Sequence, residues 1–176
     1  MTVRTVLQQA DITRALTRIS HEILESNRGS EGLVILGIPT RGVTLARRIG
    51  GILDAIEPGA GNVGSLDVTL YRDDLASQPT RAPSPTQIPA SGIDGKTVVL
   101  VDDVLYSGRT IRAALDALND HGRPRVVRLA ALVDRGHREL PIRADILGKN
   151  QPTYTTERIP VRLTEVDGVD EVTLES

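Results

Sequence analysis

Residues 98–110, VVLVDDVLYSGRT, decide the fold of this chain, because they join an apolar run, two adjacent carboxylates and a small polar turn. The run 98–101 is apolar and rich in β-branched side chains, which is typical of a strand buried on both faces of a parallel sheet. The small polar residues after it indicate the start of a helix. The stretch therefore predicts a strand, a turn and a helix, with Asp102 and Asp103 at the carboxyl end of the strand, where ligands bind in such sheets.

The turn after the two aspartates has the chemistry of a phosphate site. Ser107, Gly108 and Thr110 offer small side chains, hydroxyl donors and backbone N–H groups at the positive end of a helix. Asp102 and Asp103 can accept hydrogen bonds from the two hydroxyls of a ribose. The stretch is neither a Walker A loop nor a GxGxxG motif, so it predicts a ribose 5-phosphate site. The alternative, an acidic helix cap without a ligand, would leave a carboxylate in need of a partner or water.

Length predicts a single domain, and the bulk composition agrees with an enzyme of this size. The chain has 176 residues and a mass of 19.0 kDa, which is the size of a single domain. It has no cysteine, no apolar run long enough to span a bilayer and no signal peptide, so we expect a cytoplasmic protein without membrane contact. The only aromatic residues are Tyr71, Tyr106 and Tyr154. Binding of single-stranded nucleic acid through aromatic stacking is therefore disfavoured.

Charge is distributed unevenly along the chain. The net charge is −2, but the last thirteen residues hold five acidic and no basic side chains, and the remaining residues then carry 21 basic and 18 acidic ones. Nineteen of the 21 basic residues are arginine. Arginine suits bidentate phosphate binding, although GC-rich coding or thermal adaptation would give the same bias. Composition alone therefore leaves the ligand open.

The hydrophobic pattern alternates between helices and strands. Asp11 is a suitable N-cap for a helix that runs to about residue 28. Its expected apolar stripe, at helical spacing, consists of Ile12, Leu16, Ile19 and Ile23. We expect strands at residues 33–38, 63–70, 98–101 and 126–133, and helices at about 43–56 and from the turn to about 121.

This order predicts a doubly wound α/β fold, a mostly parallel sheet flanked by helices, in a single domain of residues 1–176. Residues 71–95 are rich in proline and poor in apolar side chains, so we expect a long flexible loop at about 72–95, of a length that is usually functional or disordered. The segment 133–153 is polar and irregular, and a small C-terminal hood over the site is expected at about residues 134–176.

Two further segments fit an anion site. The loop 39–42 follows a predicted buried strand and precedes a helix, so its amides and Arg41 can hold a pyrophosphate; an ordinary strand-to-helix turn is the alternative. The segment DVTLYRDDL, residues 67–75, places Arg72, Asp73 and Asp74 at the mouth of the long loop. That loop could close over a ligand and exclude water from an oxocarbenium-like centre, or the segment is a solvated charged turn.

Residues 98–110 closely resemble the phosphoribosyl pyrophosphate (PRPP) signature of type I phosphoribosyltransferases. Four more strings extend the resemblance over nearly the whole chain: LTRISHEI at 16–23, TRG at 40–42, DVTLYRDDL at 67–75 and LVDRGHRELPIRADILGKN at 132–150. Together they resemble the PyrR family of pyrimidine operon regulatory proteins, which are also uracil phosphoribosyltransferases. The string DRGHRELP is more discriminating than the PRPP motif.

The resemblance implies an activity, a cofactor and partners. The activity is the transfer of ribose 5-phosphate from PRPP to uracil, which gives UMP and pyrophosphate, with Mg²⁺ held mainly by PRPP rather than by the protein alone. The regulatory function is binding of pyr leader messenger RNA in the presence of UMP or UTP. The resemblance also implies a homodimer or tetramer.

The resemblance assigns the site residue by residue. Asp102, Asp103 and Arg72 become the catalytic group. Uracil is expected near Val133, Asp134, Arg135 and Ile159. PRPP and nucleotide are expected to contact Thr40, Arg41, Gly42, Asp102, Asp103, Val104, Leu105, Tyr106, Ser107, Gly108, Arg109 and Thr110.

Spacing gives independent support for an RNA surface. Positions 14, 18 and 21 lie on one helix face, away from the apolar stripe, and a second basic cluster follows residue 134; a dimer could join the two clusters into a phosphate-binding surface. The predicted RNA-binding residues are Arg14, Thr17, Arg18, His21, His137, Arg138, Arg143 and Lys149. The alternative is a solvated face of ion pairs with Glu22, Glu25, Glu139 and Asp145.

Three other functions are alternatives to this interpretation of the sequence. The chain could be an RNA-binding attenuation regulator with vestigial catalysis. A purine or orotate phosphoribosyltransferase is disfavoured by DRGHRELP and by the scarcity of aromatic residues for purine stacking. A purine repressor of related fold is disfavoured because the chain has no room for an added N-terminal DNA-binding domain.

Overall fold

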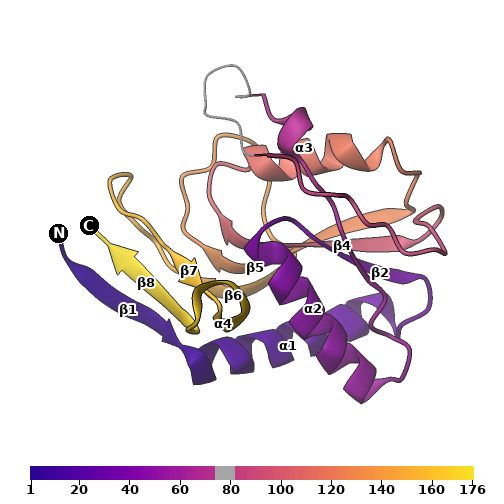
Figure 1. The fold of residues 1–176 in the computed structure, drawn as a ribbon, viewed down its shortest axis with the longest axis horizontal. Helices are drawn as coiled ribbons and strands as arrows, with labels where there is room; N and C mark the ends of the chain where they lie inside the picture. Colours follow the sequence, from indigo (N-terminus) through magenta and orange to yellow (C-terminus); the bar gives the residue numbers. More distant parts are fainter. Residues whose placement is uncertain (74–81) are drawn as a thin grey trace.

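The computed structural model describes residues 1–73 and 82–176, and the fold in these residues contains two sheets (Figure 1). The larger sheet has five strands and the smaller has three. The strands are β1 (Val3–Gln8), β2 (Leu33–Gly37), β3 (Val63–Ser65), β4 (Thr97–Leu105), β5 (Val126–Asp134), β6 (Ile146–Asn150), β7 (Val161–Arg162) and β8 (Glu171–Glu175). The helices are α1 (Gln9–Asn27), α2 (Arg41–Ile56), α3 (Arg109–Leu118) and the short α4 (Thr164–Asp167), with a 3₁₀ turn at Thr69–Tyr71.

The large sheet has the order β3-β2-β4-β5-β6, and every neighbouring pair is parallel. The chain first moves from β2 outward to β3 and then returns past β2 to β4, so the winding direction reverses between β2 and β4. Gly37 at the end of β2 is in register with Val101 of β4. In doubly wound sheets the ligand crevice lies outside the carboxyl ends of the strands at this switch point. The predicted doubly wound fold is confirmed, and the two predicted anion loops follow these two strands.

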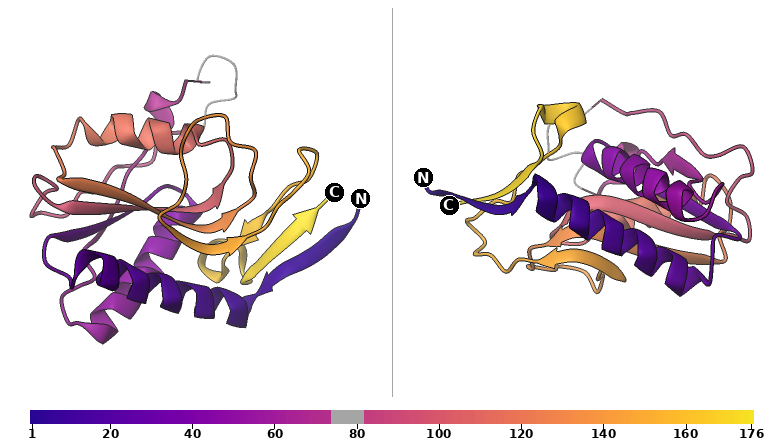
Figure 2. Two further views of the ribbon diagram at one scale, coloured as in Figure 1. Left: turned by 180° about the vertical axis from the view of Figure 1, so that it is seen from behind. Right: turned by 90° about the horizontal axis from the view of Figure 1, so that it is seen from below.

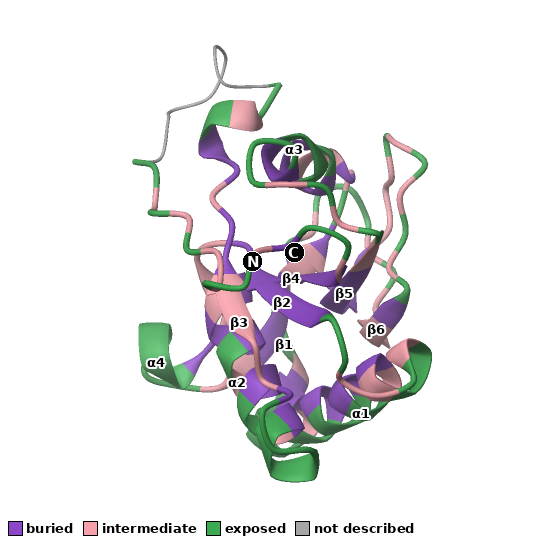
Figure 3. Ribbon diagram, turned by 90° about the vertical axis from the view of Figure 1, so that its right-hand side faces the viewer, coloured by how far each residue is buried: buried purple, intermediate pink, exposed green. Residues whose placement is uncertain are grey.

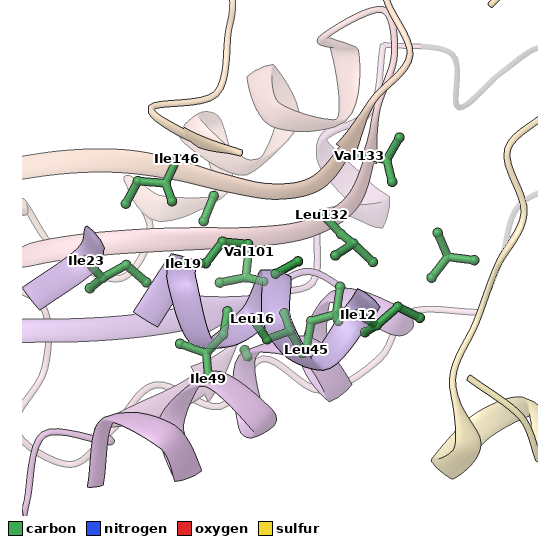
Figure 4. Packing of buried hydrophobic residues seen from close by; sticks show 14 of the residues in the cluster. Ile12, Leu16, Ile19, Ile23, Leu45, Ile49, Val101, Leu132, Val133 and Ile146 are labelled. Atoms are coloured by element: carbon green, nitrogen blue, oxygen red, sulfur yellow. The ribbon is translucent and has the colours of Figure 1, made fainter. Parts of the chain in front are cut away.

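Helices cover both faces of the large sheet. α1 and α2 lie on one face and α3 on the other (Figures 1 and 2). The expected apolar stripe of α1 packs with α2 onto the sheet (Figure 4). This cluster includes Ile12, Leu16, Ile19, Ile23, Leu45, Ile49, Val101, Leu132, Val133 and Ile146. Figure 3 shows the same division, with buried strands inside and exposed outer helix faces. None of the helices in the described ranges combines the length and apolar character needed to cross a membrane.

The hood differs from the expectation in its composition. Its sheet has the order β1-β8-β7 and is antiparallel, so residues 3–8 at the start of the chain supply one of its strands. Figure 2 shows the two termini side by side. Residues 146–150 form β6, which pairs in parallel with β5 and belongs to the large sheet instead of the hood. The expectation was wrong there because β6 is a short edge strand with a polar half, and such a strand has little local signal.

Two local boundaries also differ. Gln8, not Asp11, is the N-cap of α1; Asp11 lies at the third helical position and its carboxylate accepts the Gln8 N–H at 2.9 Å, in a capping box. The strand expected at 63–70 ends at Ser65, because the hydroxyl of Thr69 donates to Asp67 (2.8 Å) and this local bond favours the 3₁₀ turn over a ladder. The long loop is described from residue 82 onward, where Gln87 bridges to Ser65, and residues 74–81 lie outside the described residues.

Candidate active site

The two adjacent carboxylates lie in the last part of β4, which continues to Leu105. Asp102 is 8% exposed, and its Oδ1 accepts the N–H of Asp103 at 2.9 Å. Asp103 is only partly buried and accepts the N–H of Val104 at 2.8 Å. Burial, and after it the negative charge of Asp103, raises the pKa of Asp102 well above its usual value. Asp102 therefore keeps its proton to a higher pH than an exposed aspartate does.

The loop between β4 and α3 is held on one side by the segment after β5. The carbonyl of Ser107 accepts the N–H groups of Glu139 (2.9 Å) and Leu140 (3.2 Å). Gly108 has a φ of +92°, and a Cβ there would lie 3.3 Å from the Cβ of Ile142, so glycine is the residue that fits. The N–H groups of the first turn of α3 have no acceptor within the helix. The predicted phosphate loop is thus fixed in place and has donors for an anion.

The loop 39–42 lies against the middle of β4 at Val101, the residue directly before the two carboxylates. Its peptide bond between Pro39 and Thr40 is cis. The N–H of Ile38 donates to the carbonyl of Val101 at 3.0 Å. A Cβ on Gly42 would overlap that same carbonyl, so a larger residue would push the loop away. These two contacts with Val101 bring the predicted pyrophosphate loop next to the predicted ribose carboxylates.

Arg72 and Asp73 connect the start of the long loop to the phosphate loop. Arg72 donates to the hydroxyl of Thr110 at 3.3 Å, and its charge partly offsets the raised pKa of Asp102. Arg109 pairs with Asp73 at 2.6 Å. The predicted catalytic Arg72 is thus at the site, while Asp74 lies outside the described residues.

The predicted uracil residues gather at the end of β5. The N–H of Arg135 donates to the carbonyl of Leu105 at 3.1 Å, which joins this end to the end of β4. The Arg135 guanidinium lies 4.2 Å from the centre of the Tyr106 ring. Ile159 of the hood is buried in the same cluster as Val133. These contacts place the end of β5, the phosphate loop and the hood around one region.

Asp134 and Arg138 form an ion pair that is hydrogen-bonded to the phosphate loop. Arg138 donates to the carboxylate of Asp134 (2.5 Å) and to the carbonyls of Ile142 (2.6 Å) and Tyr106 (2.8 Å). Burial acts to raise the pKa of Asp134, but the hydrogen bonds from Arg138 and from the Gly136 N–H outweigh it and lower that pKa. Arg138 and His137 were both predicted to bind RNA. His137 is hydrogen-bonded through Nε2 to the carbonyl of Thr153 at 2.6 Å.

Three of the remaining basic residues lie together between α1 and β6. A hollow of about 380 Å³ there is lined by Arg14 and Arg18 of α1 and by Lys149 of β6, whereas Arg143 lines a separate hollow beside α3. Arg14 pairs with Asp11 (2.5 Å). Arg18 pairs with Glu22 (3.1 Å) and also donates to two carbonyls of β6. The hydroxyl of Thr17 donates to the carbonyl of Thr13 within α1, and His21 and Arg143 are exposed.

One residue near the site was not predicted. Asp167 of α4 holds the guanidinium of Arg41 with two hydrogen bonds, of 3.1 and 2.7 Å. The available signal was the acidic run at the end of the chain, but nothing in the sequence pairs it with the loop at 39–42. Within residues 1–73 and 82–176 there is no group of three or more His, Asp or Glu side chains that could hold a metal ion.

Comparison with known proteins gives the family. The model of the phosphoribosyl transferase domain matches residues 2–164. The chain is 72% identical to the bifunctional protein PyrR of Leifsonia xyli subsp. xyli, over 99% of this chain and 98% of that protein. It is 63% identical to the bifunctional protein PyrR of Streptomyces coelicolor, over 97% of this chain and 89% of that protein.

Solved structures of similar fold include hypoxanthine phosphoribosyltransferases. That of Trypanosoma cruzi superposes with a TM-score of 0.73 at 15% identity, over 98% of this chain and 94% of the other. A hypoxanthine-guanine phosphoribosyltransferase of Bacillus anthracis gives 0.69 at 16% identity, over 99% of each chain. These likenesses concern the fold alone, whereas the sequence matches concern the family. The chain therefore belongs to the phosphoribosyltransferase family and, within it, to the family of bifunctional PyrR proteins.

Proposed function

We propose that the chain transfers ribose 5-phosphate from PRPP to uracil, giving UMP and pyrophosphate, and that it regulates pyrimidine biosynthesis genes by binding pyr leader messenger RNA when a uridine nucleotide is present. The observation that carries the catalytic half is the meeting of two loops at the switch point. The loop 39–42 and the loop 106–108 flank the carboxylates of Asp102 and Asp103 there. Membership of the PyrR family supports uracil as the acceptor.

The transfer needs positioning and charge stabilisation more than covalent chemistry. A bond forms between uracil N1 and C1 of the ribose, the bond from C1 to the pyrophosphate oxygen breaks with its electron pair leaving on pyrophosphate, and the N1 proton passes to the leaving pyrophosphate. Asp102 and Asp103 hold the ribose hydroxyls and stabilise the positive charge that develops on the ring. The amides of the loop 106–108 hold the 5-phosphate, and Thr40, Arg41 and Arg72 attend to the pyrophosphate.

The donor set suits Mg²⁺ bound together with the substrate. Mg²⁺ keeps several waters and binds through one or two carboxylates plus substrate phosphates, and Asp102 and Asp103 are the carboxylates beside the pyrophosphate loop. When bound with PRPP, Mg²⁺ supplies Lewis-acid stabilisation of the pyrophosphate leaving group. The residues of this chain then orient the ribose and exclude water.

The hollow between α1 and β6 supports the regulatory half. Arg14, Arg18 and Lys149 line it, and Arg143 lies exposed before β6. Basic side chains of this kind contact the phosphates of a nucleic acid. A homodimer or tetramer would enlarge this surface, and messenger RNA and PRPP would meet the protein in the cytoplasm.

The test measures both activities on one preparation. UMP and pyrophosphate are quantified after incubation with uracil, PRPP and Mg²⁺, and binding of a pyr leader RNA is titrated with and without UMP. We expect product formation, and RNA binding that UMP strengthens. RNA binding without product formation would favour the attenuation regulator with vestigial catalysis, and product formation without RNA binding would remove the regulatory half.

A further inference from the structure

The guanidinium of Arg41 is held by a residue far away in the sequence. Its Nε and Nη2 donate to the two carboxylate oxygens of Asp167, at 3.1 and 2.7 Å, across 126 positions of the chain. The carboxylate is fixed in turn, because its Oδ2 also accepts the N–H of Leu163 at 2.8 Å. The hydrogen bond with Arg41 is the largest cause that lowers the pKa of Asp167, so the carboxylate is charged at neutral pH.

The edge of Arg41 that Asp167 occupies is the one that suits a phosphate. Nε–H and Nη–H form a planar fork that binds two oxygens of one anion, either a carboxylate or a phosphate. One fork cannot hold both anions in this way. Arg41 belongs to the loop 39–42 expected from the sequence and is the first residue of α2, which begins two residues earlier than expected; the charge of Asp103 contributes to the raised pKa of Arg41 after the stronger effect of Asp167. A pyrophosphate bound at this fork must therefore displace Asp167.

The hood does not depend on this pair for its attachment. Arg48 lies seven residues after Arg41 on α2 and binds both Glu165 (2.6 Å) and Asp170 (2.7 Å). The Asp170 side chain is only 6% exposed, and it also accepts the N–H and the hydroxyl of Thr164. The contacts of Arg48 thus also join the α4 segment to α2. Among the described residues, Arg41 is the side chain that hydrogen-bonds the carboxylate of Asp167, and the charge of Arg162 acts on it more weakly.

We propose that Asp167 is a positioning residue of the transfer reaction. Its carboxylate holds Arg41 against the hood, and the pyrophosphate group of the substrate takes its place on Arg41. Binding of PRPP breaks the pair, and departure of pyrophosphate restores it. Asp167 thereby weakens the binding of PRPP and of pyrophosphate, and speeds the release of pyrophosphate. The inference rests on the proposed function in one respect, that Arg41 binds pyrophosphate.

The test compares Asp167→Asn with Glu165→Gln, a neutralised carboxylate of the same α4 segment that pairs with Arg48 instead. Magnesium pyrophosphate and PRPP are titrated calorimetrically into each full-length variant, and KM and kcat are measured with uracil. For Asp167→Asn we expect binding of pyrophosphate about three- to tenfold tighter, a lower KM for PRPP and a kcat no higher than that of the parent. Glu165→Gln should match the parent. Pyrophosphate binding by Asp167→Asn that is equal to or weaker than that of Glu165→Gln overturns the proposal.

A double-mutant cycle shows whether Asp167 acts through Arg41. In an Arg41→Gln background, Asp167→Asn should no longer change pyrophosphate affinity, and a change as large as in the parent would overturn the proposal. Arg41→Gln that binds pyrophosphate like the parent would also overturn it, even if uracil is converted. Tighter pyrophosphate binding by Asp167→Asn in a protein that does not convert uracil would support this inference and contradict the proposed base.

Discussion

The guanidinium of Arg135 stacks on the ring of Tyr106 at 4.2 Å, and this contact joins the end of β5 to the phosphate loop after β4. Arg135 is 9% exposed and donates to the hydroxyl of Thr153 and to the carbonyl of Glu157. Tyr106 is 42% exposed, so much of its surface is open to solvent, and the His137 ring lies 6.0 Å from its centre. The proposed base site and the proposed phosphate site thus share a side-chain pair.

Replacing Tyr106 by Leu should weaken uracil binding. Removal of a cation–π contact of this kind costs about 0.5 to 1 kcal/mol, which corresponds to a roughly two- to fivefold higher KM for uracil. The KM for PRPP should change less, because the backbone of the loop is kept. Tyr154→Leu is the control, since that side chain is 77% exposed. An equal effect in both variants would show that the stack does not support the base.

The double variant Asp102→Asn, Asp103→Asn should lose uracil-dependent pyrophosphate release by at least about a hundredfold, because both ribose contacts and their charge are removed. It should still fold. Because the native fold raises the pKa of Asp102, the free energy of unfolding falls as pH rises from the unfolded pKa of this group towards its higher native pKa. The Asp102→Asn substitution removes this pH-dependent loss of stability. Asp116→Asn, exposed on α3, is the control, and unchanged turnover of the double variant would refute the site.

Asp170→Asn should destabilise the protein at neutral pH but not in strong acid. Hydrogen bonds from Arg48 lower the pKa of Asp170 to about 2, below its unfolded value of about 4. Its stabilisation is therefore complete above about pH 4 and is lost as pH falls towards 2. We expect a loss of about 1 to 2 kcal/mol in the free energy of unfolding at pH 7, after allowance for solvent screening. Denaturant unfolding at pH 7 and pH 2 measures this, and a difference that persists at pH 2 contradicts the ion pair as its cause.

The double variant Arg143→Gln, Lys149→Gln tests the RNA surface. These residues suit the test better than Arg18 and Arg138, whose guanidinium groups bind carbonyls within the fold. Affinity for pyr leader RNA should fall, and the slope of log affinity against log salt should become shallower by roughly 0.7 to 0.9 for each RNA phosphate that is no longer neutralised. UMP synthesis should stay within a few-fold of the parent. Arg47→Gln, exposed on α2, serves as the control, and an unchanged salt slope would indicate a solvated face.

The centre of the fold and of the site could be predicted from the sequence because the signals are local. The apolar run of β4, its two carboxylates and Gly108 are adjacent in the chain, and so are the residues of the loop 39–42. Parallel strands then bring the two loops to the same edge of the sheet.

What escaped prediction depends on contacts between distant parts of the chain. Val3 pairs with Glu175 in the hood, and strands at the ends of a chain have weak local patterns. The pair of Arg41 and Asp167 is set by where α4 packs on α2, which no spacing in the sequence specifies. Arg138 was expected to face RNA because an exposed and an internally bonded arginine look the same in a sequence.

Competition among bases tests the central claim most directly. Uracil, hypoxanthine, adenine and orotate are presented together with PRPP and Mg²⁺, and the nucleotides formed are separated and quantified. We expect uracil to be used at least about tenfold better than any of the others, a difference of about 1.4 kcal/mol in transition-state stabilisation. Preferential formation of a purine nucleotide would contradict the account and indicate a purine salvage enzyme.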